Sequence, residues 1–185
     1  MTSRLYQWHK SSLLLALCFF YSTASWAHGP TRQKVTETVA INAPAAEVWA
    51  MIKDFGNAHT WLPMVESTEI EGGNEPGAMR VLTLGPGIKV YETLKKYSEE
   101  KMRYTYRIPN ETHDVAILPV NNYSSTVSVK ANGDTSVVTW KGAFYRGYPN
   151  NDPPPELNDE AAVAAVTGLY QAGLAHLKKI IEAPE

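Results

Sequence analysis

The change in hydrophobic period along the second half of the chain most constrains its fold. From Val65 to Tyr148 apolar and polar residues alternate, and clusters of glycine, proline and asparagine divide this stretch into short strands. The proline-rich run from Pro149 to Pro155 can extend neither a central strand nor a helix. Residues 158–181 then place apolar side chains at helical intervals. These patterns predict an α+β fold in which one long helix covers a face of an antiparallel sheet.

The stretch before Val65 predicts one strand and two short helices. Lys34–Asn42 alternates with period two, which favours a strand. Pro44 suits the first position of a helix, where its fixed φ and missing N–H cost nothing. Gly56 and Asn57 break that helix, and His59–Leu62 can form only another turn or two. The buried side of the pair is a stripe of residues at helical spacing: Val48, Met51, Ile52 and Phe55.

The amino-terminal segment predicts export. Arg4 and Lys10 precede an apolar run, Leu13–Tyr21, and Ala27 completes a small-residue cleavage motif. A retained membrane anchor is the alternative, but a spanning helix needs about 20 apolar residues. We therefore predict that residues 1–27 are a cleaved signal peptide, that the mature protein is periplasmic, and that it has no membrane span.

The rest of the chain, residues 28–185, is predicted to form one domain. Cys18 is the only cysteine and lies in the signal, so the mature chain has no disulfide, thiolate metal site or cysteine nucleophile. The signal contains two of the 17 Lys and Arg residues and no Asp or Glu. The mature chain therefore has 15 basic and 19 acidic residues, a net charge of −4. This balance gives no electrostatic attraction to nucleic acid.

Four segments together resemble a known superfamily. The segments "INAPAAEVWAMIKDFGNAHTWLP", "GAMRVLTLGPG", "KVYETLKKY" and "RYTYRI" follow one another as in the polyketide cyclase/dehydrase branch of the START and birch-pollen-allergen-like (SRPBCC) superfamily. The resemblance implies a helix-grip fold, in which a curved sheet wraps the terminal helix around a cavity closed at one end by two short helices. The exported chain starting "HGPTRQKV" further resembles MxaD-type periplasmic proteins of methanol oxidation. That likeness implies a role in aiding methanol dehydrogenase and its cytochrome c acceptor.

One hairpin places an ion pair among aliphatic side chains. A three-residue connection, Gly85–Gly87, would produce three cross-strand pairs: Leu84 with Ile88, Leu82 with Val90, and Arg80 with Glu92. Arg80 and Glu92 would share the aliphatic face and lie inside the sheet, where burial is tolerable only if each satisfies the other. The alternative is a pair at the rim that fixes the register, worth about 0–1 kcal/mol.

The concave face predicts a binding cavity for a small hydrophobic ligand. Its apolar walls and few polar groups suit such a ligand, but a filled core with hydrogen-bonded tyrosines would give the same pattern. Gly168 and Gly173 in the terminal helix leave the same two alternatives, because small residues there admit either a ligand or a closely packed strand. The candidate cavity residues are Trp61, Arg80, Leu82, Val90, Glu92, Tyr104, Tyr106, Tyr123, Trp140 and Phe144.

The sequence gives little support for catalysis. It contains no phosphate-binding glycine loop, nucleophile elbow or HExxH motif. In an enzyme Glu92 would be the general base and Arg80 its partner, but an arginine should hold the carboxyl pKa low and weaken the base. His28 and the mature amine could chelate copper, yet further ligands at suitable spacing are lacking. His113 lies in a loop after Pro109 that could cover a cavity mouth.

We therefore predict no catalytic residue, metal or cofactor. Three functions stay open at this stage: an accessory protein of methanol oxidation, a periplasmic carrier of a lipid, quinone or aromatic molecule, and a small cyclase- or dehydratase-like enzyme.

Overall fold

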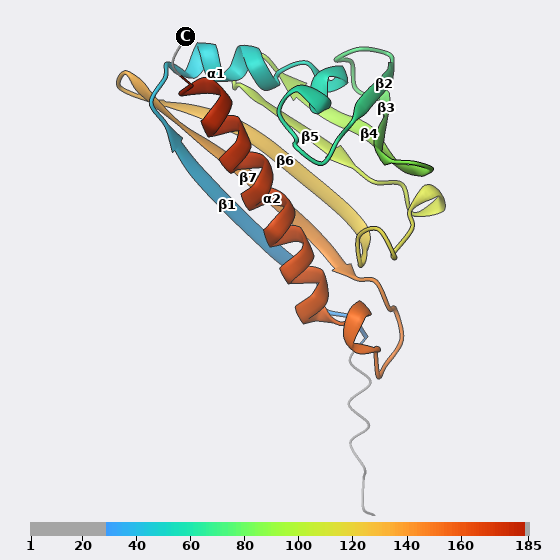
Figure 1. Ribbon diagram of the computed structural model, residues 1–185. Helices are drawn as coiled ribbons and strands as arrows, with labels where there is room; N and C mark the ends of the chain where they lie inside the picture. The colour runs from blue at the N-terminus through green and yellow to red at the C-terminus, as the bar shows by residue number, and fades with distance from the viewer. Residues whose placement is uncertain (1–28, 184–185) are drawn as a thin grey trace, which may run out of the picture.

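A seven-stranded antiparallel sheet wraps one long helix (Figure 1). The computed structural model describes residues 29–183, so the predicted signal peptide, Cys18 and His28 lie outside the described residues. The strand order is β1-β7-β6-β5-β4-β3-β2. The strands are β1 (Gln33–Ile41), β2 (Ser67–Glu71), β3 (Met79–Gly85), β4 (Ile88–Ser98), β5 (Arg103–Arg107), β6 (Val120–Asn132) and β7 (Thr135–Arg146).

The long helix α2 (Asp159–Ile181) has sequence signals at both ends. The Asn158 side chain accepts a hydrogen bond from the backbone N–H of Ala161 and caps the first turn. Acidic residues in the first turn and lysines in the last complement the helix dipole. The other helices are α1 (Ala45–Ile52) and the short 3₁₀ helices η1 (Phe55–Thr60), η2 (Asn110–Thr112) and η3 (Pro155–Leu157).

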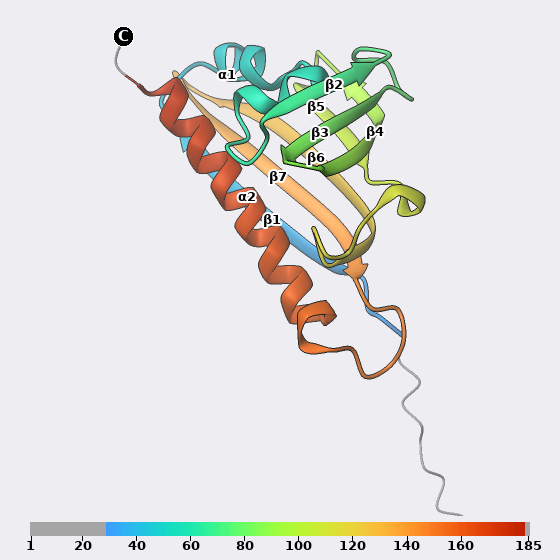
Figure 2. The ribbon, with the colours of Figure 1, turned by 45° about the vertical axis from the view of Figure 1, so that its right-hand side comes forward.

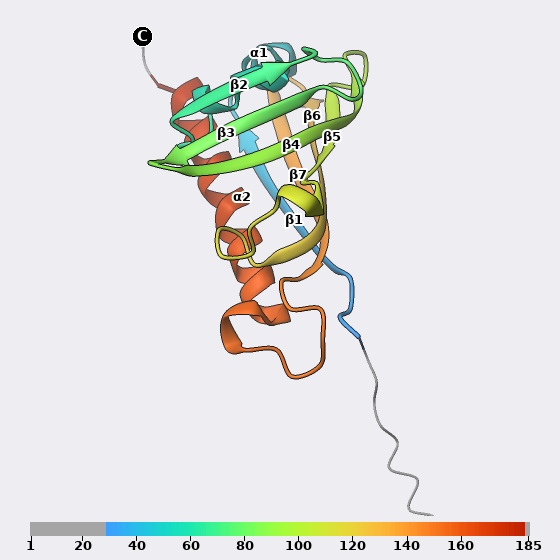
Figure 3. The same ribbon diagram turned by 90° about the vertical axis from the view of Figure 1, so that its right-hand side faces the viewer.

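The sheet is strongly coiled, and this creates its concave face. Figures 2 and 3 show β2, β3 and β4 running across the direction of β1 and β7, while α2 lies along the latter strands. The helices α1 and η1 lie at the end of the sheet where α2 finishes (Figure 1). This arrangement confirms the predicted α+β helix-grip fold. Of the helices between residues 29 and 183, none combines the length and apolarity needed to cross a bilayer.

The predicted register of the β3–β4 hairpin is correct except at its turn. Arg80 pairs with Glu92, and Leu82 pairs with Val90, as the alternation requires. The pairing of Leu84 with Ile88 is wrong. Gly85 lies opposite Ile88, because β3 bulges between Thr83 and Gly85 and leaves a two-residue turn. Ile88 is 41% exposed and does not join the buried face.

Candidate functional site

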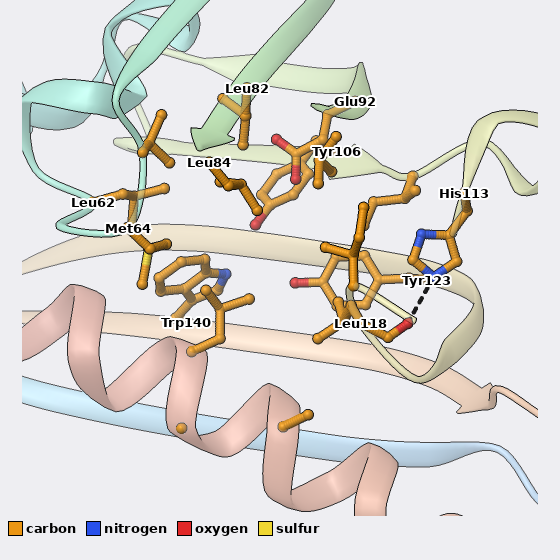
Figure 4. Close-up of a pocket in the computed structure, with 17 residues that line it drawn as sticks. Leu62, Met64, Leu82, Leu84, Glu92, Tyr106, His113, Leu118, Tyr123 and Trp140 are labelled. Carbon is orange, nitrogen blue, oxygen red and sulfur yellow. Dashed lines mark hydrogen bonds between the residues drawn. The ribbon is translucent and has the colours of Figure 1, made fainter. Parts of the chain in front are cut away.

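The structure contains a mainly apolar cavity of about 370 Å³. It lies between α2, the β3–β4 hairpin and the loop that joins β5 to β6, as the close-up in Figure 4 shows. The volume falls within the usual range of small-molecule sites, about 300–1,000 Å³. The wall is formed by Leu62, Met64, Val65, Leu82, Leu84, Val90, Glu92, Tyr106, Ile108, His113, Ile117, Leu118, Tyr123, Trp140, Ala165, Gly168 and Leu169.

Six of the ten predicted cavity residues are on this wall. Each lies on the concave face of β3, β4, β5, β6 or β7, where the two-residue period places it. They are Leu82, Val90, Glu92, Tyr106, Tyr123 and Trp140.

The other four predicted residues lie outside the cavity wall: Arg80, Tyr104 and Phe144 are on the concave face of the sheet, and Trp61 follows η1. Arg80 and Tyr104 pack beneath Phe55 of η1. The guanidinium carbon of Arg80 lies 4.0 Å from the centroid of the Phe55 ring, and the Tyr104 ring centroid lies 5.9 Å from it. Trp61 packs behind Trp140, 5.3 Å between ring centroids. Phe144 is stacked against Tyr123 and is fully buried. These four side chains therefore lie behind the wall of this cavity, because neighbouring aromatic rings cover them.

Arg80 and Glu92 form a buried ion pair next to the cavity. The Arg80 Nε donates to Glu92 Oε2 at 2.6 Å, and Nη1 donates to the carbonyl oxygen of Phe55 at 2.9 Å. Their side chains are 1% and 7% exposed, which excludes the alternative of a solvated rim pair. The guanidinium also lies over the Phe55 ring, a favourable cation–π position. Glu92 reaches the cavity wall, whereas Arg80 stays behind it.

The electrostatics of Glu92 differ from the sequence expectation. Burial raises the pKa of its carboxyl above the usual range, although the adjacent Arg80 guanidinium opposes the rise. Burial also disfavours the charge on Arg80, but Glu92, Tyr104 and Tyr106 together more than offset this and the arginine pKa is raised. The prediction that arginine would hold the carboxyl pKa low is therefore wrong, because desolvation outweighs the attraction between the charges.

A chain of hydrogen bonds joins Tyr123 and Trp140 of the cavity wall to Tyr170 and Ser125 behind it. The hydroxyl of Tyr170 lies 2.7 Å from that of Tyr123 and 2.9 Å from Ser125 Oγ. Ser125 also accepts a hydrogen bond from Trp140 Nε1 at 2.7 Å. The Trp140 and Tyr170 rings are stacked with centroids 4.3 Å apart. Burial raises the pKa values of Tyr123 and Tyr170, so both hydroxyls stay protonated at neutral pH.

The loop between β5 and β6 contributes wall residues that were not among the predicted ones. His113 Nε2 donates to the carbonyl oxygen of Leu118 at 2.9 Å, which ties the loop to itself (Figure 4). The loop is also tied to β6, where the backbone N–H of Asn122 donates to Asn110 Oδ1. The apolar run at residues 115–118, which follows the polar residues 110–114, was the available signal for this contact. Helix α2, the β1-to-β2 segment and Leu84 of β3 supply the remaining unpredicted positions.

The two glycines of α2 have different surroundings. A Cβ at Gly168, which is on the cavity wall, would meet no atom within 4 Å. A Cβ at Gly173 would lie 2.8 Å from Trp140 Cζ3 and 2.9 Å from Leu62 Cδ2. Gly168 therefore leaves open volume, and Gly173 permits close packing, so each of the two sequence alternatives applies at one position.

Comparison with known proteins establishes the family. Residues 32–182 match the profile of the polyketide cyclase/dehydrase and lipid transport family. The chain belongs to this family. A comparison with curated proteins finds no match.

Solved structures share both the fold and a modest part of the sequence. The chain is similar to an uncharacterised protein from Bacillus thuringiensis, with 30% identity and a TM-score of 0.67 over 82% of this chain and 100% of the other. It is also similar to the protein XoxI from Bacillus cereus, with 30% identity and a TM-score of 0.66 over 80% and 94% of the two chains. Norcoclaurine synthase from Thalictrum flavum, solved with dopamine and hydroxybenzaldehyde, shares the fold at 19% identity and a TM-score of 0.63, over 84% and 91%.

Proposed function

We propose that this family member binds a small, mainly apolar molecule in the cavity beneath α2. The observation that carries this proposal is the open volume of about 370 Å³ between α2, the β3–β4 hairpin and the β5-to-β6 loop. Its wall is mostly aliphatic and aromatic, and Gly168 of α2 adds no side chain to fill it. Apolar surface around an unfilled space is stabilised when a ligand of matching shape replaces water there.

The proposal is tested by binding of N-phenyl-1-naphthylamine, an uncharged fluorophore that brightens in apolar surroundings. We expect saturable binding to the purified domain and its loss in Gly168→Leu, whose side chain would project into the cavity. The matched control is Thr167→Leu, at the neighbouring position, which is not on the wall. Equal binding to both variants and the wild type would contradict the proposal. Mass spectrometry of the untreated protein under native conditions would show a co-purified ligand.

The physiological setting that we propose is periplasmic methanol oxidation. The support is the resemblance of the chain to MxaD-type proteins, together with its membership of the family. In this proposal the exported domain contacts methanol dehydrogenase or its cytochrome c acceptor transiently, with or without its ligand. Affinity capture from a periplasmic extract, followed by mass spectrometry, should recover a quinoprotein dehydrogenase. Recovery of apolar cargo without any dehydrogenase would instead favour a carrier of lipids, quinones or aromatic compounds.

A further inference from the structure

The charged groups around the cavity are arranged asymmetrically. Among the described residues on the wall there is no lysine or arginine, and Glu92 is the one carboxylate. The nearest buried cation, Arg80, is already bound to Glu92 and to the carbonyl of Phe55. A ligand carboxylate or phosphate would therefore enter a mainly apolar space without a free cation to pair with, at a large cost in desolvation.

Glu92 instead offers a hydrogen-bond acceptor to the cavity. Arg80 Nε binds one carboxylate oxygen, Oε2, while the Glu92 side chain stays on the wall. In its ion pair with Arg80 the Glu92 carboxylate only accepts hydrogen bonds, so a ligand group beside it must donate. A ligand ammonium group would donate as well, but the charge of Glu92 is already balanced by Arg80. A second buried cation would leave a net positive charge in apolar surroundings.

Of the other polar groups on the wall, those of Tyr123 and Trp140 are engaged within the protein, whereas the Tyr106 hydroxyl can both accept and donate (Figure 4). The Tyr123 hydroxyl binds Tyr170, and the Trp140 indole N–H is donated to Ser125. His113 donates Nε2–H to Leu118, so in the neutral ring its other nitrogen is an acceptor. The acceptors at Glu92 and His113 both favour a ligand that can donate a hydrogen bond.

We infer that the cavity selects an uncharged molecule whose polar end is a hydroxyl group, an alcohol or phenol, and discriminates against carboxylic acids of the same size. This inference rests on the proposed function, since it assigns the chemical class of the ligand in the same cavity. The apolar wall receives the hydrocarbon part of the molecule, and Glu92 receives its O–H.

Competition against N-phenyl-1-naphthylamine tests the inference with the wild-type protein. The competitors have similar size and differ at the polar end: 1-octanol, octanoate, octylammonium and methyl heptyl ether. Near neutral pH, where the acid is ionised, 1-octanol should displace the probe at a concentration about ten-fold lower than octanoate. 1-Octanol should also displace the probe at a concentration several-fold lower than octylammonium or methyl heptyl ether does. The ether has no hydrogen-bond donor. Equal or better displacement by octanoate would overturn the inference.

The variant Glu92→Gln tests the role of the carboxylate itself. It should lose most of the preference for 1-octanol over octanoate, because the amide carries a donor and no charge. The control Glu182→Gln changes an exposed carboxylate and should keep the wild-type order. Thermal unfolding of both variants verifies their folding, and if Glu92→Gln does not fold, the wild-type series decides. Failure of the probe to bind at all overturns the proposed function, whereas binding without discrimination overturns only the ligand class.

Discussion

The two halves of α2 meet the sheet in different ways. Around Gly173 the helix packs directly against Trp140 and Leu62, at separations that leave no room for a side chain. About one and a half turns earlier, around Gly168, the same helix borders open space. We call these the packed end, formed by Trp61, Leu62, Trp140 and Gly173, and the hollow end, formed by Leu82, Glu92, Leu118, Gly168 and Leu169.

The comparison shows that one residue type serves opposite purposes within one element. Glycine in a helix interior costs up to about 1 kcal/mol relative to alanine at each position. At the packed end this cost is offset by the close approach of an indole ring. At the hollow end no contact among the described residues offsets the cost of Gly168. This agrees with a role for Gly168 in keeping the volume of the cavity free.

The largest effect is expected at the buried Arg80–Glu92 ion pair beside the hollow end. Arg80→Met leaves Glu92 buried without its partner and should lower the free energy of unfolding by about 3–5 kcal/mol. The double variant Arg80→Met with Glu92→Leu should recover much of this loss, because it removes both charges. Urea unfolding provides the measurement. Lys89→Met, which breaks the exposed Lys89–Glu69 pair, is the control and should cost about 0–1 kcal/mol.

The same substitution at the two glycines should separate the two ends. Gly173→Leu forces a side chain into Trp140 and Leu62 and should destabilise the protein by about 3 kcal/mol. Gly168→Leu should change stability by no more than about 1 kcal/mol, since leucine favours the helix and enters open space. Thermal and urea unfolding of the pair provide the comparison. Similar losses in both variants would show that the hollow end is closed in solution.

A smaller effect is expected in the dependence of stability on pH. Because burial raises the Glu92 pKa, the folded protein binds this proton more tightly than the unfolded chain does. The stabilisation that Glu92 gives to the folded state is therefore greatest below its pKa in the unfolded chain, about 4.3. It is lost as pH rises through its pKa in the folded protein. The stability of the wild type relative to Glu92→Gln should fall as pH rises across that window.

Glu182 provides the opposite case at the surface. Its hydrogen bond with Lys178, helped by the backbone N–H of Asn42, lowers its pKa. The wild type should lose stability relative to Glu182→Gln as pH falls through the lowered value. Unfolding measured from strongly acidic to neutral pH, a range that includes values below the ordinary glutamate pKa, should therefore give differences from the wild type whose slopes have opposite sign for the two variants. Slopes of the same sign would contradict the assignment for Glu92.

The smallest effect is expected for Gly168→Ala. A methyl group there meets no atom and improves helix propensity, so the protein should gain up to about 1 kcal/mol. Because a methyl group is small, probe binding should persist, in contrast to Gly168→Leu. A loss of stability, measured by thermal unfolding, would indicate that the helix approaches the hairpin more closely than the structure shows.

The sequence by itself determined the secondary structure and most of the facing of the strands. The switch from two-residue to helical period predicted the sheet and α2, and alternation placed Arg80 opposite Glu92. This succeeded because strand periodicity is a local property of the backbone. The predicted pairing at the turn was wrong, because a bulge near Gly85 changed the partner of Ile88 and the alternation of residues gives no sign of that bulge.

Only the tertiary structure decided which buried residues border the cavity. Period two places Arg80, Tyr104 and Glu92 on one concave face, but η1 covers the first two and leaves Glu92 on the wall. The tertiary structure also decided the surroundings of the two glycines of α2: it left open space beside Gly168 and placed the indole of Trp140 against Gly173. Periodicity fixes the face on which a side chain lies, whereas the segment that packs over that face comes from distant parts of the chain and follows from the coiling of the whole sheet.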